Sequence, residues 1–240
     1  MIFYISRDES KNFGYTVARA VIESLDNIKK IDYLSNDNNV KLLITRVLSK
    51  NNKVINKLIA NNHLFIENIN YFNLILNKKK LVKNATNLNA INTLKKKELI
   101  LLDEFLKLSF FGYKSHYTLD KNVNLNINFY YKWVLNEYLN NKINNHFITY
   151  KIETKIVGFC LIGMNKNALI GKLYCVHPEY RGKGIFNDLL NYTVFLASKY
   201  KKIDKIIYTT QENNKIVTNI LNKYGFKLNY SLSTFHKWYI

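Results

Sequence analysis

The stretch LYCVHPEYRGKGIF, from Leu173 to Phe186, contains the clearest structural signal in the chain. An apolar run stops before Pro178, the only proline, and two glycines, Gly182 and Gly184, then flank a lysine. Because glycine lacks a Cβ atom, this segment can turn sharply and present consecutive backbone N–H groups to a ligand. An amphipathic run follows at once, so the pattern predicts a strand, a tight loop and a helix. The loop and the positive end of the helix dipole suit a pyrophosphate.

Two common nucleotide-binding loops do not have this spacing. A P-loop needs four residues between its glycines and then Lys-Ser or Lys-Thr, whereas one lysine separates Gly182 from Gly184 and Ile185 follows. A dinucleotide-binding fingerprint needs a third glycine three residues after the second, and Asn187 occupies that position. The segment therefore predicts another class of pyrophosphate site.

The segment resembles motif A of the GCN5-related N-acetyltransferase (GNAT) superfamily, in which Arg/Gln-x-x-Gly-x-Gly/Ala follows a strand and holds the pyrophosphate of acetyl-CoA. Arg181 to Ile185 match, and Phe186 replaces the usual Gly or Ala. A later segment is also similar, because Gln211-x-x-Asn214 opens a predicted helix that ends Tyr-Gly-Phe. The resemblance implies acetyl-CoA as co-substrate, no metal, and a cofactor-binding set of Tyr174, Cys175, Val176, Arg181, Gly182, Lys183, Gly184, Ile185, Phe186 and Asn214.

Length and composition set the outer limits of the fold. The chain has 240 residues, of which 48% are apolar, and it is long for one compact domain but short for two large ones. We expect a small α/β N-terminal domain over residues 1–80, a linker over 81–97 and a GNAT acetyltransferase domain over 98–240. The predicted fold class is α/β, with a mixed, mostly antiparallel central sheet and splayed strands in the second domain.

The expected elements follow this division. The first domain has predicted strands at 13–17 and 41–47, a helix at 54–59 and one or two strands within 61–76, and it shows no acid–base cluster. Periodicity is lost over 77–97. The second domain has helices at 98–108 and 128–136 around an aromatic loop, then a hairpin at 147–163, a strand at 168–176, a helix from 185, a strand at 205–210, a helix at 214–223 and a final strand pair. This order is that of the GNAT fold.

The net charge of +19 comes mainly from lysines spread along the chain. No basic block is interleaved with aromatic residues and no zinc-binding pattern is present, so the sequence does not predict a specific nucleic-acid site. No apolar stretch is long enough for a signal peptide or a membrane span, and we expect a cytoplasmic protein with no membrane partner. Cys160 and Cys175 lie in apolar, strand-like runs and are predicted to be buried free thiols.

A narrower resemblance, to the TDP-fucosamine acetyltransferase group, extends over nearly the whole chain. It rests on Phe13-Gly14-Tyr15-x-Val17-x-Arg19, Ser115-His116-Tyr117-x-x-Asp120, Tyr130-x-x-Trp133-x-x-Asn136 and Phe235-His236-Lys237-Trp238. That group acetylates the 4-amino group of a TDP-linked 4-amino-4,6-dideoxyhexose for bacterial surface polysaccharides. The resemblance implies a nucleotide-linked amino sugar as partner, leaves a homodimer open, and gives a substrate-binding set of Ser115, Tyr117, Tyr130, Trp133, Asn136 and Trp238.

The superfamily resemblance also implies direct attack of a neutral amine on the thioester, with a backbone N–H near Cys175 or Val176 stabilising the oxyanion. The superfamily often uses a tyrosine to protonate the leaving thiolate, but this chain has Leu221 there. The candidate catalytic residues are Tyr224 as the acid and His236 and His177 as bases.

Two other functions stay open. An acetyltransferase of protein N-termini or lysines would need an acidic groove for a basic peptide, and the basic charge of this chain argues against it. A noncatalytic module that binds acyl-CoA or nucleic acid remains because Leu221 and Phe186 depart from the superfamily pattern.

Overall fold

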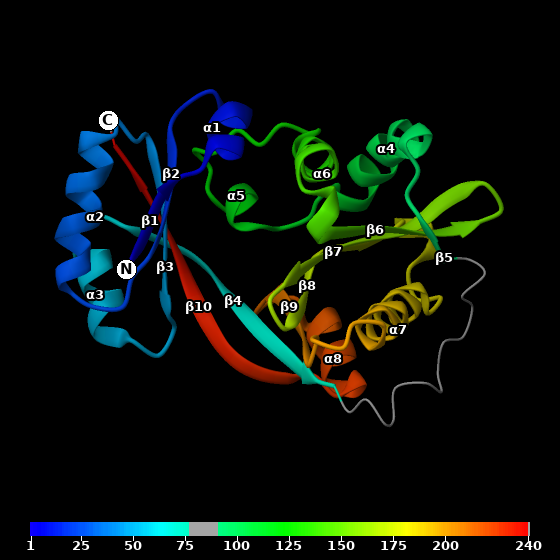
Figure 1. Ribbon diagram of the computed structural model, residues 1–240. Coiled ribbons are helices and arrows are strands. Elements are labelled where there is room, and N and C mark those ends of the chain that lie inside the picture. The colour runs from blue at the N-terminus through cyan, green and yellow to red at the C-terminus, as the bar shows by residue number, and fades with distance from the viewer. Residues whose placement is uncertain (77–90, 240) are drawn as a thin grey trace.

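The computed structural model describes residues 1–76 and 91–239. Within these ranges the strands form one ten-stranded sheet in the order β1-β2-β3-β10-β4-β9-β8-β7-β6-β5 (Figure 1). The strands are β1 (Ile2–Ile5), β2 (Val17–Val21), β3 (Leu42–Leu48), β4 (Leu64–Ile75), β5 (Ile91–Thr93), β6 (Asn145–Ile152), β7 (Lys155–Asn165), β8 (Ala168–Val176), β9 (Lys205–Gln211) and β10 (Lys227–Trp238).

Eight α-helices lie on this sheet within the described residues. Helices α2, α3, α7 and α8 pack on one face, and α1, α4, α5 and α6 cover the other (Figure 1). Their bounds are α1 (Arg7–Phe13), α2 (Asp26–Asp37), α3 (Asn52–Ala60), α4 (Leu99–Phe110), α5 (His116–Leu119), α6 (Phe129–Asn140), α7 (Ile185–Ser198) and α8 (Lys215–Tyr224).

The sheet consists of two halves that share one order of elements, β2-α2-β3-α3-β4 in the first and β8-α7-β9-α8-β10 in the second. Strands β2 and β3 are parallel, as are β8 and β9, and one helix joins the members of each pair. Each half continues through a second helix into a last strand, β4 in the first half and β10 in the second. The last strands are exchanged, because β10 pairs with β3 and β4 pairs with β9, while β4 and β10 also pair with each other. The two expected domains therefore share one continuous sheet.

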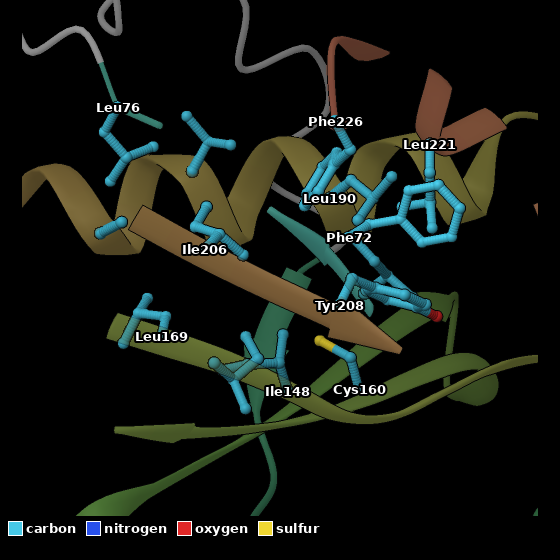
Figure 2. Close-up of a cluster of buried hydrophobic side chains, with 14 of the residues drawn as sticks. Phe72, Leu76, Ile148, Cys160, Leu169, Leu190, Ile206, Tyr208, Leu221 and Phe226 are labelled. Atoms are coloured by element: carbon cyan, nitrogen blue, oxygen red, sulfur yellow. The ribbon is translucent and has the colours of Figure 1, made fainter. Parts of the chain in front are cut away.

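A buried apolar cluster between the sheet and helices α7 and α8 holds the second half together (Figure 2). Phe72 from β4 belongs to this cluster, so the first half contributes to the core of the second. Leu221 on α8 is fully buried there, with an exposed fraction of 0%. The residue that replaces the superfamily's usual tyrosine is thus a core residue.

The structure corrects several expected elements. The segment 13–17 is not one strand, because α1 ends at Phe13 and Gly14 caps it in the left-handed region with φ of 77°. The final strand pair is the single strand β10. Ile91–Thr93, expected in the linker, forms the edge strand β5 on β6, whereas residues 77–90 lie outside the described ranges. Helix α2, strand β1 and the short helix α5 had no prediction.

The expectations for β8, for the start of α7 and for the two cysteines are confirmed. Strand β8 has the predicted bounds of 168–176, and α7 begins at the predicted residue 185. Both cysteines are buried and free, and burial raises the pKa of each thiol. Among the described helices, none is both long and apolar enough to cross a membrane.

Candidate active site

Strands β8 and β9 separate halfway along their length and form a fork. Their parallel pairing covers Ala168–Gly171 against Lys205–Tyr208 and stops there. Beyond this point β8 pairs only with β7 and β9 pairs only with β4. The rings of Tyr174 and Tyr208 lie 5.0 Å apart at the fork, and a Cβ atom on Gly171 would come within 2.9 Å of both. The fork leaves backbone N–H groups on the β9-facing edge of β8 without a strand partner.

The loop before α7 presents unpaired backbone donors. Gly182 and Gly184 have φ of 78° and 83°, which glycine adopts without the strain of a side chain. No backbone N–H of residues 182–187 donates a hydrogen bond within the described part of the chain, and α7 has no side-chain cap. These donors face solvent at the positive end of a 14-residue helix. The geometry suits an anion such as a pyrophosphate.

The side chains around this loop leave its donors free. The Phe186 ring turns away from the loop and packs 5.8 Å from Tyr174 and 6.0 Å from Tyr208. Arg181 donates to the carbonyls of Val176 and Ser109, so its guanidinium fixes the loop to the end of α4. Lys183 lies 4.7 Å above the Tyr180 ring, where its charge stays near the loop. The bulky Phe186 therefore connects the loop to the fork without blocking the amides.

A cavity of about 420 Å³ opens at the fork and extends between the two halves of the molecule. Its volume is in the range of small-molecule sites. Tyr174, Tyr208 and Gln211 line it at the fork, and helices α5 and α6 cover it with an aromatic wall. Residues of the first half that line it include Glu9, Arg19, Arg46 and Glu67. The sequence predicted no acid–base cluster in that half, and this expectation was wrong.

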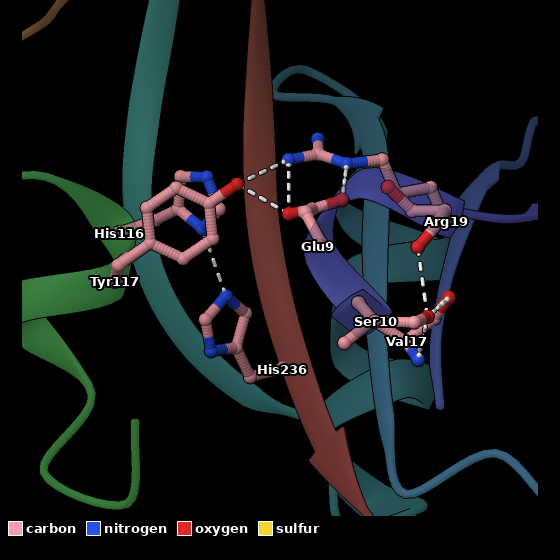
Figure 3. Close-up of polar contacts among 8 residues, drawn as sticks. Glu9, Ser10, Val17, Arg19, His116, Tyr117 and His236 are labelled. Carbon is pink, nitrogen blue, oxygen red and sulfur yellow. Dashed lines mark hydrogen bonds and ion pairs between the residues drawn. The ribbon is translucent and has the colours of Figure 1, made fainter. Parts of the chain in front are cut away.

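One wall of the cavity is a buried ion pair (Figure 3). Arg19 on β2 donates to both carboxylate oxygens of Glu9, with Nε–Oε2 and Nη2–Oε1 distances of 2.5 and 2.7 Å. The Tyr117 hydroxyl donates to Glu9 and accepts from Arg19. Burial alone would raise the pKa of Glu9, but the charge and hydrogen bonds of Arg19 outweigh it and hold that pKa below its usual value. The pair is neutral overall and fully partnered.

A hydrogen-bond chain leads from the interior to the cavity. Asp120 Oδ2 lies 2.6 Å from His236 Nδ1. His236 Nε2 lies 3.0 Å from His116 Nδ1 (Figure 3). If Asp120 accepts from His236, then His236 Nε2 must accept from His116, which leaves His116 Nε2 as an acceptor. Burial, together with the charge of Arg19, lowers the pKa of His116 well below its ordinary value. His116 is therefore a neutral ring that lines the cavity.

Glu67 and Arg46 occupy the cavity floor without partners. Glu67 has an exposed fraction of 6%, and neither carboxylate oxygen has a hydrogen-bond partner of good geometry. Burial raises its pKa to about 7, against the opposing effects of Arg46 and the His116 backbone N–H. The Arg46 Nε atom is likewise buried without a partner. An acid poised near neutrality in a cleft is typical of a functional group.

Four of the six expected substrate-binding residues line the cavity, namely Ser115, Tyr117, Tyr130 and Trp133. Asn136 instead donates to Asp8 at the exposed rim. The Trp238 indole donates to Asp120 and packs against Tyr15, so it supports the chain of histidines. Four of the six residues thus lie on the cavity wall, while Asn136 lies at the rim and Trp238 holds Asp120 in place.

The three expected catalytic residues do not line the cavity. His236 has an exposed fraction of 0% and reaches the cavity only through His116. The Tyr224 hydroxyl donates to Asn191 on α7, and burial raises its pKa to about 12. His177 is buried against the rings of Phe105 and Tyr180. These positions suit packing and support of the site.

Among the expected cofactor-binding residues, Tyr174 and Asn214 line the cavity. The Tyr174 hydroxyl hydrogen-bonds Thr193 on α7, and the Asn214 side chain caps α8 by accepting from the Val217 N–H. Cys175 points into the core under α4 and α6. Sequence reasoning missed Arg46, Glu67 and His116, although His116 stood within a quoted motif.

No metal site accompanies this cavity in the part of the chain that the structure describes, since no three His, Cys, Asp or Glu side chains there could hold an ion together.

One family model matches part of the second half. Residues 144–228 match the family described as "Acetyltransferase (GNAT) domain", and this span includes β8, the loop and α7. No curated protein matches the chain.

Solved structures resemble the whole chain in fold. A functionally unknown conserved protein from Staphylococcus epidermidis superposes with a TM-score of 0.66 at 10% identity, over 98% of this chain and 90% of its own. A GCN5-related N-acetyltransferase from Sphaerobacter thermophilus gives 0.65 at 10% identity, over 98% and 76%. A tandem GNAT protein from the clavulanic acid biosynthesis pathway gives 0.57 at 11% identity, over 86% and 66%. The chain thus has the predicted α/β fold, and residues 144–228 are similar to the GNAT acetyltransferase domain.

Proposed function

We propose that this chain is an acetyl-CoA-dependent N-acetyltransferase whose amine acceptor binds in the cavity between the two halves. The proposal rests on three features of the site that lie next to one another. Unpaired amides of residues 182–187 suit a pyrophosphate, the fork between β8 and β9 leaves a strand edge for a thioester, and the cavity with Glu67 begins at the same fork.

In the proposed reaction the amine nitrogen attacks the thioester carbonyl carbon. A C–N bond forms, the C–S bond breaks, and CoA leaves as a thiolate that takes a proton from solvent. A backbone N–H on the free edge of β8 stabilises the negative charge on the carbonyl oxygen. No covalent intermediate with the protein is required.

Glu67 is the proton acceptor in this proposal. Its pKa of about 7 is close to the working pH, where a general base is most effective. The charged and titratable groups that face it are Arg46 on β3, His116 on α5, Tyr113 before α5 and Tyr130 on α6. His116 has the lower pKa of the two candidate acceptors, so we assign it a hydrogen bond to the amine.

The narrower resemblance proposes a nucleotide-linked amino sugar as acceptor. Support comes from Ser115, Tyr117, Tyr130 and Trp133, which belong to its motifs and line the cavity. Aromatic side chains with a polar end suit a sugar ring.

The test is thiol release from acetyl-CoA with a panel of TDP- and UDP-linked 4-amino-6-deoxy sugars and of simple primary amines. We expect turnover with at least one amine and a product whose mass increases by one acetyl group. Acetyl-CoA binding without turnover on any amine would contradict the proposal.

A further inference from the structure

Some charged side chains of the cavity form ion pairs or hydrogen bonds, and others do not. Arg19 and Glu9 neutralise each other, and Lys172 at the rim pairs with Glu137 at 2.9 Å. Asp8, also at the rim, accepts from Asn136. Among the described residues, Arg46 and Glu67 form no ion pair within 4.0 Å, with each other or with another group. The floor therefore presents one free cation and one free carboxylate.

The sheet register places these two charges in one row. Thr234 on β10 is opposite Arg46 on β3 and opposite Glu67 on β4. Directly opposite residues of antiparallel strands point to the same face. Neighbouring strands lie about 4.8 Å apart, so the Cα atoms of Arg46 and Glu67 are about 10 Å apart. The Arg46 charge is close enough to lower the pKa of Glu67, but the two side chains form no ion pair within 4.0 Å.

The atoms in this row lack partners within the protein. Both Glu67 oxygens, Arg46 Nε and Thr234 Oγ1 are buried and have no hydrogen-bond partner of good geometry, although the His116 backbone N–H acts on Glu67. A buried polar atom without a partner destabilises the fold, and a charged one does so more strongly. Arg46 and Glu67 line the cavity, so their unpartnered atoms are the arrangement expected of a ligand site whose ligand supplies the missing partners. Burial, with the nearby charge of Arg19, also lowers the pKa of Arg46, and a bound anion would oppose that shift.

We propose that the acceptor is a primary amine with an anionic group only a few bonds away, so that its ammonium contacts Glu67 and its anion contacts Arg46. This inference rests on the proposed function, because it concerns the acceptor of the same reaction. A carboxylate, a phosphate monoester or the diphosphate of a nucleotide sugar can supply the anion. Arg46 binds the charged group before reaction, and Glu67 then takes the proton that the amine loses.

The experiment compares paired acceptors that differ only in the anion. Thiol release from acetyl-CoA is measured with glycine and glycinamide, β-alanine and its amide, phosphoethanolamine and ethanolamine, and a TDP-linked 4-amino-6-deoxy sugar. Each is run with the wild type, Arg46→Gln, Arg46→Lys and Arg7→Gln. Arg7 is an exposed arginine outside the cavity, so its variant controls for loss of one positive charge.

We expect the wild type to prefer the anionic member of at least one pair. Arg46→Gln should raise KM for that acceptor on the order of 30-fold and abolish the preference. Arg46→Lys should restore part of it, and Arg7→Gln should change nothing. The preferred pair identifies the anion as carboxylate or phosphate, and turnover of the sugar alone identifies the diphosphate.

Equal turnover of charged and uncharged members by the wild type would overturn this inference and leave the proposed function intact. A preference that survives in Arg46→Gln would also overturn it. Absence of thiol release with every amine would instead contradict the proposed function on which it rests. Melting temperatures of the variants establish that each is folded.

Discussion

The two halves of the molecule share the order strand–helix–strand–helix–strand but differ where a helix follows the first parallel strand. In the second half, α7 begins after Gly184 with no side-chain cap, and its first amides are open. In the first half, α2 also begins without a side-chain cap, but the backbone N–H groups of Asn27 and Ile28 donate to the carbonyls of Ser24 and Leu25. The Asn27 side chain also accepts from the N–H groups of Glu23 and Ser24 just before the helix. The same architecture is thus open to an anion in one half and closed in the other.

The parallel strands show the same contrast. All of β2 pairs with β3, whereas only Ala168–Gly171 of β8 pairs with β9. The first half therefore has no fork that could hold a thioester. It contributes Glu9, Arg19, Arg46 and Glu67 to the cavity instead. In our account, the second half binds acetyl-CoA and the first supplies the charged groups that recognise the acceptor.

The largest expected effect is on acetyl-CoA affinity, from a substitution that displaces the loop amides before α7. Gly184→Val places a β-branched residue at φ of 83°, which is strained and displaces the loop amides. We expect the Kd for acetyl-CoA to rise on the order of 100-fold, measured by calorimetry. Gly14→Val is the matched control, since Gly14 has φ of 77° and also faces open space. It should lower stability but leave acetyl-CoA affinity unchanged, and an equal loss in both variants would contradict the division of roles.

The next effect concerns the proposed base. Glu67→Gln keeps the shape of the side chain but cannot accept a proton, and we expect kcat to fall on the order of 100-fold with acetyl-CoA affinity retained. In the wild type Glu67 is the active base only when deprotonated, so kcat/KM should rise with pH through about 7. In Glu67→Gln, kcat/KM should not rise with pH through this range. If the pH profile of kcat/KM were unchanged in Glu67→Gln, another group would be the proton acceptor.

A smaller effect is expected from the histidine chain. His236→Gln removes the acceptor of His116 Nδ1 without touching the ligand, so kcat should fall about tenfold while KM changes little. His146→Gln is a suitable control because His146 hydrogen-bonds Tyr200 and does not line the cavity. Equal activities of the two variants would reduce His236 to a packing role.

The smallest effect on activity is expected at Leu221. Leu221→Tyr forces a ring into a filled core and should destabilise the fold by about 1–3 kcal/mol without raising kcat. Ile216→Tyr, at an exposed position of the same helix, should leave stability unchanged. An increase in kcat for Leu221→Tyr would mean that this position reaches the leaving group.

Local signals predicted the loop and its neighbours well. The glycines, the proline and the apolar run fixed β8 and α7 because each acts within a few residues. The strand exchange was not predictable in this way, since β10 has its partners β3 and β4 about 160 residues or more away in sequence. Its 12 residues therefore suggested a hairpin.

The charged floor of the cavity escaped prediction for a similar reason. Glu67 and Arg46 are polar residues in strands, which is the pattern of a solvent-facing position. Helices from the second half cover that face, so their burial depends on packing between distant segments. His116 was overlooked because its partner His236 is 120 residues away.

Hydrogen exchange of the backbone amides with and without acetyl-CoA tests the central claim most directly. We predict protection of residues 182–187 at the start of α7 and no change in residues 24–29 at the start of α2. Protection at α2, or none at α7 under saturating acetyl-CoA, would contradict the assignment of the cofactor to the second half.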